Sequence, residues 1–341
     1  MRILFIDVGT NLKTVRDLEN RARGGMVTSL FRVSDYLSRR HHVYVSSDIE
    51  VPGQTKAGTN WIHEPFGPFD VLVCNRGIGH GYPSIEAKAR VLWTHDLPHS
   101  GFIPEPKSIR GFKCTVFMSR YAERIWRTFY QDIGKSVLIP NGVDKELFHP
   151  REKDLGYLIY ASAPNRGLEK LPLIAESIDE IIDKDVYCRA FSNLALMHPG
   201  EGEDVFDYSE IRESIVDLKD PLPQKSFAEE LGKAGLMILP SDYPEICSNS
   251  VLQALASGTP VITTGKMGAT CEWVKHRKNG MLTKFLSHDY MVHSLEIARN
   301  AIEVLRNERL HRKLIRGASR TLVLSWDEVG RRWLKLIEGI V

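Results

Sequence analysis

The stretch LMILPSDYPEICSNSVLQALASGTPVIT, residues 236–263, shows most clearly which fold to expect. Its first four residues are apolar and end at Pro240, a pattern typical of a buried strand. A polar turn follows, and a helical spacing of apolar residues begins after Ser248 and stops at Gly258, a common helix terminator. The last residues predict another strand. Strand, loop, helix and strand follow one another here, and Glu245 lies in the loop.

Ligand sites of open parallel sheets lie at the carboxyl ends of the strands, where Glu245 is expected. The helix that follows adds backbone N–H groups in its first turn, and such groups attract anions. We therefore predict an anion-binding helix start next to Glu245, formed by Ile246, Cys247, Ser248 and Asn249.

The same stretch resembles the signature of the retaining family 4 glycosyltransferases. The resemblance lies in a Pro-Ser pair, a Pro-Glu pair and the run A-x-x-x-G-x-P-V-I. One position departs, because the second glutamate of the family signature falls on Gln253. An ordinary Rossmann-like segment with a surface glutamate is the alternative interpretation. The matching residues are Pro240, Ser241, Pro244, Glu245, Ala254, Gly258, Pro260, Val261 and Ile262.

Strand and helix patterns alternate in both halves of the chain, which favours two Rossmann-like domains with parallel sheets. Strands are expected at 3–6, 43–45, 71–74, 91–94, 115–119, 137–140, 157–161 and 186–191. Helices are expected at 26–37, 120–130, 227–234, 290–306 and 309–321, and from Ser325 onward. Residues 7–23 are expected to form a long polar loop.

The family resemblance covers nearly the whole chain and implies the GT-B fold, an α/β architecture of two domains that face each other across a cleft. The run N-G-V-D at 141–144, with F-H-P at 148–150, resembles the family hinge. We expect an acceptor-side domain at residues 1–150 plus 325–341, whose last helix crosses back. A nucleotide-sugar-binding domain is expected at residues 151–324.

Two loops resemble the family's contacts to the donor diphosphate. Gly24 and Gly25 open a helix after the first strand, where backbone N–H groups can approach a phosphate closely. A Gly-Gly pair is also common in ordinary turns. In the second domain, Asn165 and Arg166 precede Gly167, and a guanidinium there can contact two phosphate oxygens at once.

The second loop departs from the family pattern. The family normally carries another basic residue a few positions before the one that matches Arg166, but residues 160–165 contain no Lys or Arg. Lys266, or a residue of the basic N-terminal loop, could supply the missing charge.

His95 is the remaining candidate for catalysis. It follows the strand at 91–94, and it resembles the strand-end histidine that contacts the donor sugar in the family. Asp96 could orient its ring. A purely structural histidine is the alternative.

Two other motifs are discounted. The glycine-rich run at 77–81 fails the dinucleotide fingerprint because Tyr82 stands where the third glycine belongs. Asp183 and Asp185 match a D-x-D metal motif of a different transferase fold, but they lie in a charged, solvated run.

A basic helix face is predicted where Arg120, Arg124 and Arg127 recur at helical spacing, with Ile125, Trp126 and Phe129 nearby. A face that contacts an acceptor or a membrane surface and an ordinary amphipathic helix both fit this pattern.

Composition limits the partners. The net charge of +2 gives no reason to expect nucleic acid, but residues 1–150 hold 20 basic and 15 acidic residues, a local charge of +5. A basic N-terminal half suits an anionic acceptor or a membrane surface.

The five cysteines are odd in number and widely spaced, which favours reduced thiols in a cytoplasmic protein. The opening MRILFIDVG is a predicted strand, too short for a signal peptide, and membrane contact is expected to be peripheral, at the inner face.

The resemblance implies a retaining glycosyltransferase that moves a hexose-type sugar from a nucleotide-diphosphate sugar to a glycan or lipid-linked glycan in polysaccharide biosynthesis. Glu245, His95 and Arg166 are the expected catalytic residues. The donor is expected to bind to Gly24, Gly25, Asn165, Gln253 and the helix start formed by residues 246–249. Neither a metal nor another cofactor is expected. The departures leave a weak or inactive homologue that binds nucleotide or glycan as an alternative. A phosphorylase or an epimerase on the same fold is a third possibility.

Overall fold

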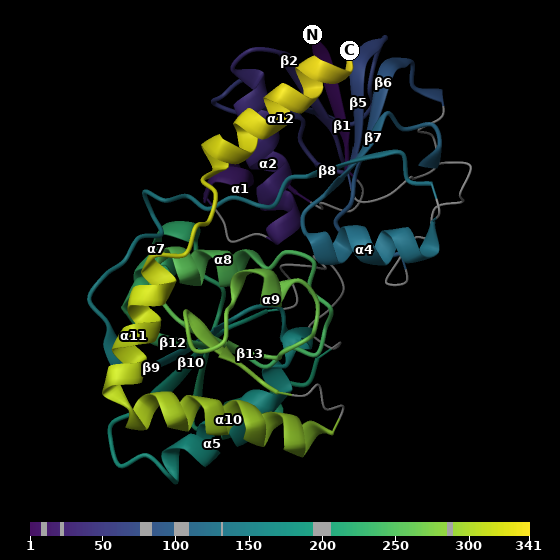
Figure 1. Cartoon of the computed structure of the whole chain (residues 1–341). Coiled ribbons are helices and arrows are strands. Elements are labelled where there is room, and N and C mark those ends of the chain that lie inside the picture. The colour runs from purple at the N-terminus through teal and green to yellow at the C-terminus, as the bar shows by residue number, and fades with distance from the viewer. Residues whose placement is uncertain are drawn as a thin grey trace. The chain divides into compact units, whose positions relative to one another are not determined.

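A computed structural model of the chain describes residues 1–7, 12–20, 24–75, 84–98, 109–130, 132–193, 206–284 and 289–341 (Figure 1). They form two units. The first consists of Met1–Gly142 and Leu324–Val341, and the second of Val143–Val323. From the sequence, the domain boundaries were predicted after residue 150 and before residue 325.

The first unit contains an eight-stranded sheet with the order β3-β4-β2-β1-β5-β6-β7-β8. All neighbouring pairs are parallel except β3 with β4. The strands are β1 (Arg2–Ile6), β2 (His42–Ser46), β3 (Gly53–Gln54), β4 (Asn60–Ile62), β5 (Phe69–Asn75), β6 (Ala87–Trp93), β7 (Cys114–Phe117) and β8 (Lys135–Leu138). The helices are α1 (Val15–Asn20), α2 (Gly25–Ser38), α4 (Arg120–Phe129) and α12 (Trp326–Ile340).

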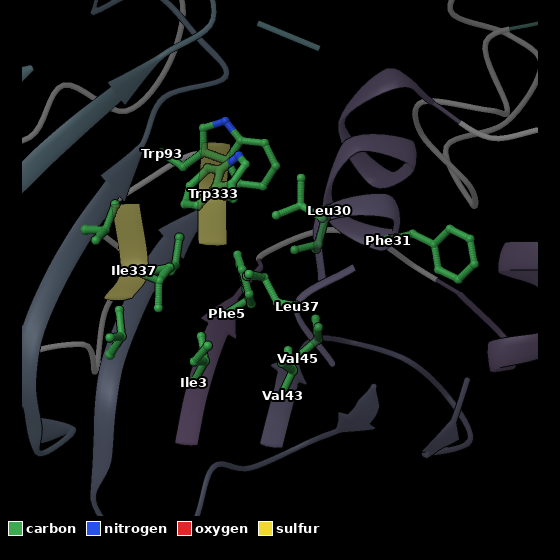
Figure 2. Close-up of a cluster of buried hydrophobic side chains, with 14 of the residues drawn as sticks. Ile3, Phe5, Leu30, Phe31, Leu37, Val43, Val45, Trp93, Trp333 and Ile337 are labelled. Carbon is green, nitrogen blue, oxygen red and sulfur yellow. The ribbon is translucent and has the colours of Figure 1, made fainter. Parts of the chain in front are cut away.

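The last helix of the chain, α12, completes the core of this unit. It begins with a capping box in which the Ser325 hydroxyl accepts from the Glu328 amide and the Glu328 carboxylate accepts from the Ser325 amide. The helix buries Trp333, whose ring lies 4.7 Å from that of Trp93 and 6.2 Å from that of Phe5 (Figure 2). Ile337 lies one turn further along and is also fully buried. The C-terminal segment is therefore an integral part of the first hydrophobic core.

The second unit contains a six-stranded sheet with the order β11-β10-β9-β12-β13-β14, and all of its pairs are parallel. The strands are β9 (Asp154–Ala161), β10 (Tyr187–Phe191), β11 (Val216–Lys219), β12 (Ala234–Leu239), β13 (Val261–Thr263) and β14 (Gly280–Leu282).

Short and long helices connect these strands, and α10 packs against α5. The 3-10 turns are η2 (Pro164–Arg166) and η3 (Leu168–Lys170). The α-helices are α5 (Leu171–Asp179), α6 (Ser209–Glu213), α7 (Gln224–Lys233), α8 (Asn249–Ala256), α9 (Thr270–Trp273), α10 (Tyr290–Arg306) and α11 (Glu308–Ser319).

The predicted central strands and long helices are confirmed, including strand, loop, helix and strand across 236–263. The expected loop at 7–23 is wrong in part, because residues 15–20 form α1, which is capped at its start by Asp17 accepting from the Thr14 amide. The short strands β3, β4, β11 and β14 were not predicted. The glycine-rich run at 77–81 lies outside the described residues, as do residues 8–11 and 21–23 of the predicted N-terminal loop.

Both sheets contain a point where the strand order reverses. In the first sheet it lies between β1 and β5, and in the second between β9 and β12. Ligand sites of such sheets lie between the loops at the carboxyl ends of the two strands on either side of this point. Arg166 follows β9 and Glu245 follows β12, so each lies after the carboxyl end of its strand, as predicted, and the strand order brings both to this switch point.

A buried histidine gives the second unit a testable pH dependence. His311 of α11 is 1% exposed, and its Nε2 lies 2.9 Å from the Gly235 carbonyl oxygen at the start of β12. Burial lowers the pKa of His311, an effect that the hydrogen bond with Gly235 only partly offsets.

Because the folded-state pKa is depressed, the unfolded chain binds the proton more readily. Stability should therefore fall as the pH drops below about 6.5, by up to about 1.4 kcal/mol per pH unit until the folded pKa is passed. The stability difference between wild type and His311→Gln, measured by urea unfolding at pH 5 to 8, should follow this course. A difference that stays constant over that range would contradict the assignment.

Candidate active site

The turn after β9 reaches the end of β12 because of one glycine. Gly167 has φ +92°, a left-handed conformation that favours glycine, and a Cβ at this position would overlap the Pro240 carbonyl. The chain therefore passes directly over the end of β12. This close approach holds the neighbouring Arg166 beside the loop that contains Glu245.

Arg166 and Glu245 form an ion pair at this switch point. Arg166 Nε donates to Glu245 Oε1 over 2.7 Å, and Arg166 Nη1 donates to Asn165 Oδ1 over 2.6 Å. The two charged side chains are 11% and 17% exposed, so the bond is partly shielded from water. The structure brings together three of the predicted site residues, Asn165, Arg166 and Glu245.

Tyr243 completes the support of Arg166. The guanidinium carbon lies 3.5 Å from the centre of the Tyr243 ring, and the Tyr243 amide donates to Ser241 Oγ. The flat guanidinium is thus held on an aromatic face on one side and by a carboxylate at its edge. Tyr243 was not predicted as a site residue. Its place two residues before Glu245, inside the turn, was the available signal.

The loop that follows β13, residues 264–269, contacts the backbone of Glu245; it contains two glycines and is called the glycine loop below. The Ala269 amide donates to the Glu245 carbonyl over 2.5 Å, and Gly268 has φ +60°. A Cβ on Gly268 would lie 2.5 Å from the backbone nitrogen and oxygen of Glu245. The loop after β13 therefore presses on the backbone that carries the carboxylate.

The start of α8 lies next in the chain. Ile246, Cys247 and Ser248 are each 8% exposed, and Ser248 is the N-cap of α8, as predicted. The Ser248 hydroxyl is not used to cap the helix; it lies 3.2 Å from the Ser250 hydroxyl. The N-terminus of α8, with Asn249 as its first residue, thus carries partial positive charge close to the Arg166–Glu245 pair.

Gln253 faces a second amide. It is 8% exposed, and its Nε2 donates to Gln224 Oε1 at the start of α7 over 2.9 Å. This pairing leaves the Gln253 carbonyl oxygen and the Gln224 amide nitrogen to contact other groups. Gln224 was missed by the sequence analysis, because only the fold brings α7 next to α8.

A second cation lies near Arg166 but is already engaged. Lys170 is 4% exposed and donates to Glu169 Oε1 over 2.6 Å and Asp242 Oδ2 over 3.3 Å. Burial alone would lower its pKa, but the hydrogen bonds and charges of these two carboxylates outweigh burial and raise it. Lys170 is therefore a protonated structural residue, and Lys266, exposed in the glycine loop, remains the candidate for the missing charge.

The remaining predicted residues lie in the first unit. Gly24 is the N-cap of α2 and Gly25 its first residue, so both are at a helix N-terminus as expected. His95 follows β6, and its ring lies 4.5 Å from that of Trp93. The next residue, Asp96, accepts a hydrogen bond from Trp126 Nε1 through its carbonyl.

Two polar residues that the sequence analysis missed lie at the switch point of the first sheet. Asp7 follows β1 and Asn75 is the last residue of β5. They are 3% and 0% exposed, and Asn75 Nδ2 donates to Asp7 Oδ1 over 2.6 Å. Buried polar side chains at this edge are typical of a binding site or of the loops that support one.

Among the described residues, no group of three or more His, Cys, Asp or Glu side chains is arranged to hold a metal ion. Within the same part of the chain, no helix is long and apolar enough to cross a bilayer.

Comparison with known proteins shows a similarity of the second unit to a family of transferases. Residues 158–305 match the family described as Glycosyl transferases group 1. Over 223 residues, the chain is 25% identical to an exopolysaccharide phosphotransferase of Streptomyces coelicolor. That match covers 61% of this chain and 22% of the relative, so the chain spans only a small part of that protein's length.

Solved structures match both units. Sucrose-phosphate synthase from Thermosynechococcus elongatus gives a TM-score of 0.77 at 15% identity, over 99% of this chain and 98% of the other. HepE from Anabaena, in complex with UDP and glucose, gives 0.72 at 14% identity, over 99% and 100%. The predicted GT-B fold of two Rossmann-like units is confirmed, and so is the predicted resemblance to the glycosyltransferases.

The glycine loop offers a test of how the site is held together. Gly268→Ala should displace the backbone of Glu245, lower stability by about 1–3 kcal/mol and weaken ligand binding, because Cβ meets backbone atoms that cannot move independently. Gly58→Ala is a matched control, since Gly58 also has a positive φ (+105°) but a Cβ there meets nothing within 4 Å. Urea unfolding of both variants would measure the effect. Equal stabilities would show that the glycine loop does not constrain Glu245.

Proposed function

We propose that the protein is a retaining glycosyltransferase that moves a hexose-type sugar from a nucleotide-diphosphate sugar to a glycan or lipid-linked glycan. The observation that carries the proposal is the Arg166–Glu245 pair at the switch point between β9 and β12, beside the N-terminus of α8. The family match over residues 158–305 supports it, because that region includes the whole of this site.

The chemistry follows from the charges. When the bond between the sugar and the diphosphate breaks, negative charge develops on the leaving phosphate oxygen. Arg166 and the amides at the start of α8 stand ready to stabilise that charge, and a single well-placed donor of this kind contributes roughly 100- to 1,000-fold in rate. These positive groups belong to the protein itself, which supports a mechanism without a metal.

Glu245 has a different role in this proposal. Its Oε1 accepts from Arg166, and a carboxylate has further lone pairs that can accept hydrogen bonds from sugar hydroxyls. The arrangement would hold the sugar next to the diphosphate with no acidic residue acting as a nucleophile. Retention by attack on the same face as the leaving group is the mechanism that the family resemblance implies.

The other donor contacts are proposed by the same logic. Gln253 and Gln224 together present one acceptor and one donor, which suits the two ribose hydroxyls of a nucleotide. In the first unit, the start of α2 at Gly24 and Gly25 would contact the diphosphate, and His95 would contact the sugar. These roles rest on the resemblance together with positions at a helix N-terminus and a strand end.

The acceptor and the location are inferred from weaker signals. The relative from Streptomyces coelicolor is named for an exopolysaccharide, which supports a role in polysaccharide biosynthesis. Arg120, Arg124 and Arg127 share one face of α4 and are exposed, and this face would suit an anionic acceptor or peripheral contact with the inner membrane surface of a cytoplasmic enzyme.

A weak or inactive homologue is the second candidate. Arg166 is paired with Glu245, and Lys170 is engaged by two carboxylates, so neither cation near the switch point is unpaired before a ligand binds. Such a protein would bind a nucleotide or glycan without transferring the sugar.

Thermal shift measurements against nucleoside diphosphates and their sugar forms, beginning with UDP and UDP-glucose, test the proposal. A ligand at 100 times its dissociation constant should add about 2.7 kcal/mol of stability. In Glu245→Ala the sugar form should lose its advantage over the diphosphate. Glu213→Ala, an exposed position on α6, should behave like wild type.

The outcomes separate the two candidates. Nucleotide-sugar consumption that requires an added glycan acceptor would establish transfer, whereas selective binding without consumption would favour the inactive homologue. If no nucleotide shifts the protein, the proposed donor site is wrong.

A further inference from the structure

A hollow lies at the amino-terminal ends of the strands in the second unit. Its volume is about 690 Å³, and it is lined by residues at the amino-terminal ends of β9 and β10 and along α7. The candidate active site lies at the carboxyl ends of the same parallel strands, so this hollow is a separate place on the molecule. Its size falls within the range of small-molecule sites.

Two tyrosines form an aromatic platform in the hollow. Tyr157 and Tyr187 are paired in register on neighbouring parallel strands, and their rings stack 4.8 Å apart at 12°. Tyr157 is 1% exposed, whereas Tyr187 is 41% exposed. The buried ring thus supports an exposed one, and the Arg189 guanidinium carbon lies 5.5 Å from the centre of the Tyr187 ring.

The platform is held in place by its hydroxyl groups. Tyr187 donates to Asp154 Oδ2 and Tyr157 donates to Glu230 Oε2, each over 2.8 Å. Burial and the bond to Asp154 raise the pKa of Tyr187 to about 12, so the phenol stays a neutral donor. A fixed exposed ring with carboxylates at its edge resembles the combination that sugars require, an apolar face for the ring and acceptors for its hydroxyls.

The hollow also contains positive charge that the protein does not use. Among the described residues, the buried Nε of Arg151 donates no hydrogen bond, and Lys233 lines the hollow as an exposed side chain. By contrast, Arg189 is bonded to Asp217 and Glu230. Lys153 is held by the carbonyls of Gly232 and Ser257.

Four basic and three acidic side chains line the hollow, and the acidic ones include exposed Glu152. This mixture suits a ligand with one anionic group and several hydroxyls. A nucleoside diphosphate carries more negative charge and fewer hydroxyl donors than such a ligand, and Asp154 and Glu230 would repel it.

We propose that this hollow binds an anionic sugar unit, with the pyranose ring on Tyr187 and its carboxylate or phosphate on Arg151 and Lys233. The site is distinct from the proposed donor site and does not depend on its chemistry. In a glycan-modifying protein, the hollow would hold an anionic sugar unit of a glycan chain on the second unit.

Titration of the full chain with glucuronic acid, glucose 6-phosphate and neutral glucose, followed by NMR, tests this inference. Both anionic sugars should bind at least about tenfold more tightly than glucose, and the stronger of the two identifies the anion that is preferred. Saturating UDP should not displace them. Equal binding of glucose, absence of binding by both anionic sugars, or displacement by UDP would overturn the proposal.

Variants of the lining residues provide matched controls. Lys233→Gln should weaken glucuronic acid binding about threefold, whereas Glu152→Gln should strengthen it by a similar factor, since both positions are exposed and differ in charge sign. Tyr187→Ala should abolish binding, and Tyr187→Phe, which keeps the ring, should retain it. Changes of the same sign for Lys233→Gln and Glu152→Gln, or loss of binding in Tyr187→Phe alone, would contradict the proposed pose.

Discussion

The ion pair between Arg166 and Glu245 is the interaction on which the candidate site depends. It joins the turn after β9 to the loop after β12, across the switch point of the second sheet. Removing either partner would leave a partly buried charge uncompensated, which is costly. The glycines at 167 and 268 permit the close backbone approaches that set its geometry, and Tyr243 supports the guanidinium from its face.

The two units share one feature, a parallel sheet with polar side chains at the point where its strand order reverses. In each, a parallel sheet reverses its strand order and leaves polar side chains at the carboxyl edge: Asp7 and Asn75 in the first unit, and Arg166 and Glu245 in the second. The rest of each sheet is a hydrophobic support. In the first unit that support includes Trp333 of the last helix, so residues distant in sequence share one core with β1 and β6.

Much of the fold was readable from the sequence, because buried parallel strands are continuous apolar runs and helices show their 3.6-residue spacing. The helix start at Ser248 and the long helix at 290–306 were predicted correctly. The strands β3, β4 and β14 are only two or three residues long, too short to show a period. The roles of Tyr243 and Gln224 could not be predicted, because they arise from contacts between separate loops and helices. The tyrosine platform likewise depends on the register between β9 and β10.

The central claim is that Arg166, at the switch point of the second sheet, recognises a diphosphate. The most direct measurement compares the dissociation constants of uridine and UDP for wild type and Arg166→Gln by calorimetric titration. The account predicts that wild type binds UDP at least about tenfold more tightly than uridine, and that Arg166→Gln loses most of this advantage while uridine binding is unchanged. A UDP advantage that persists in full in Arg166→Gln would contradict the account.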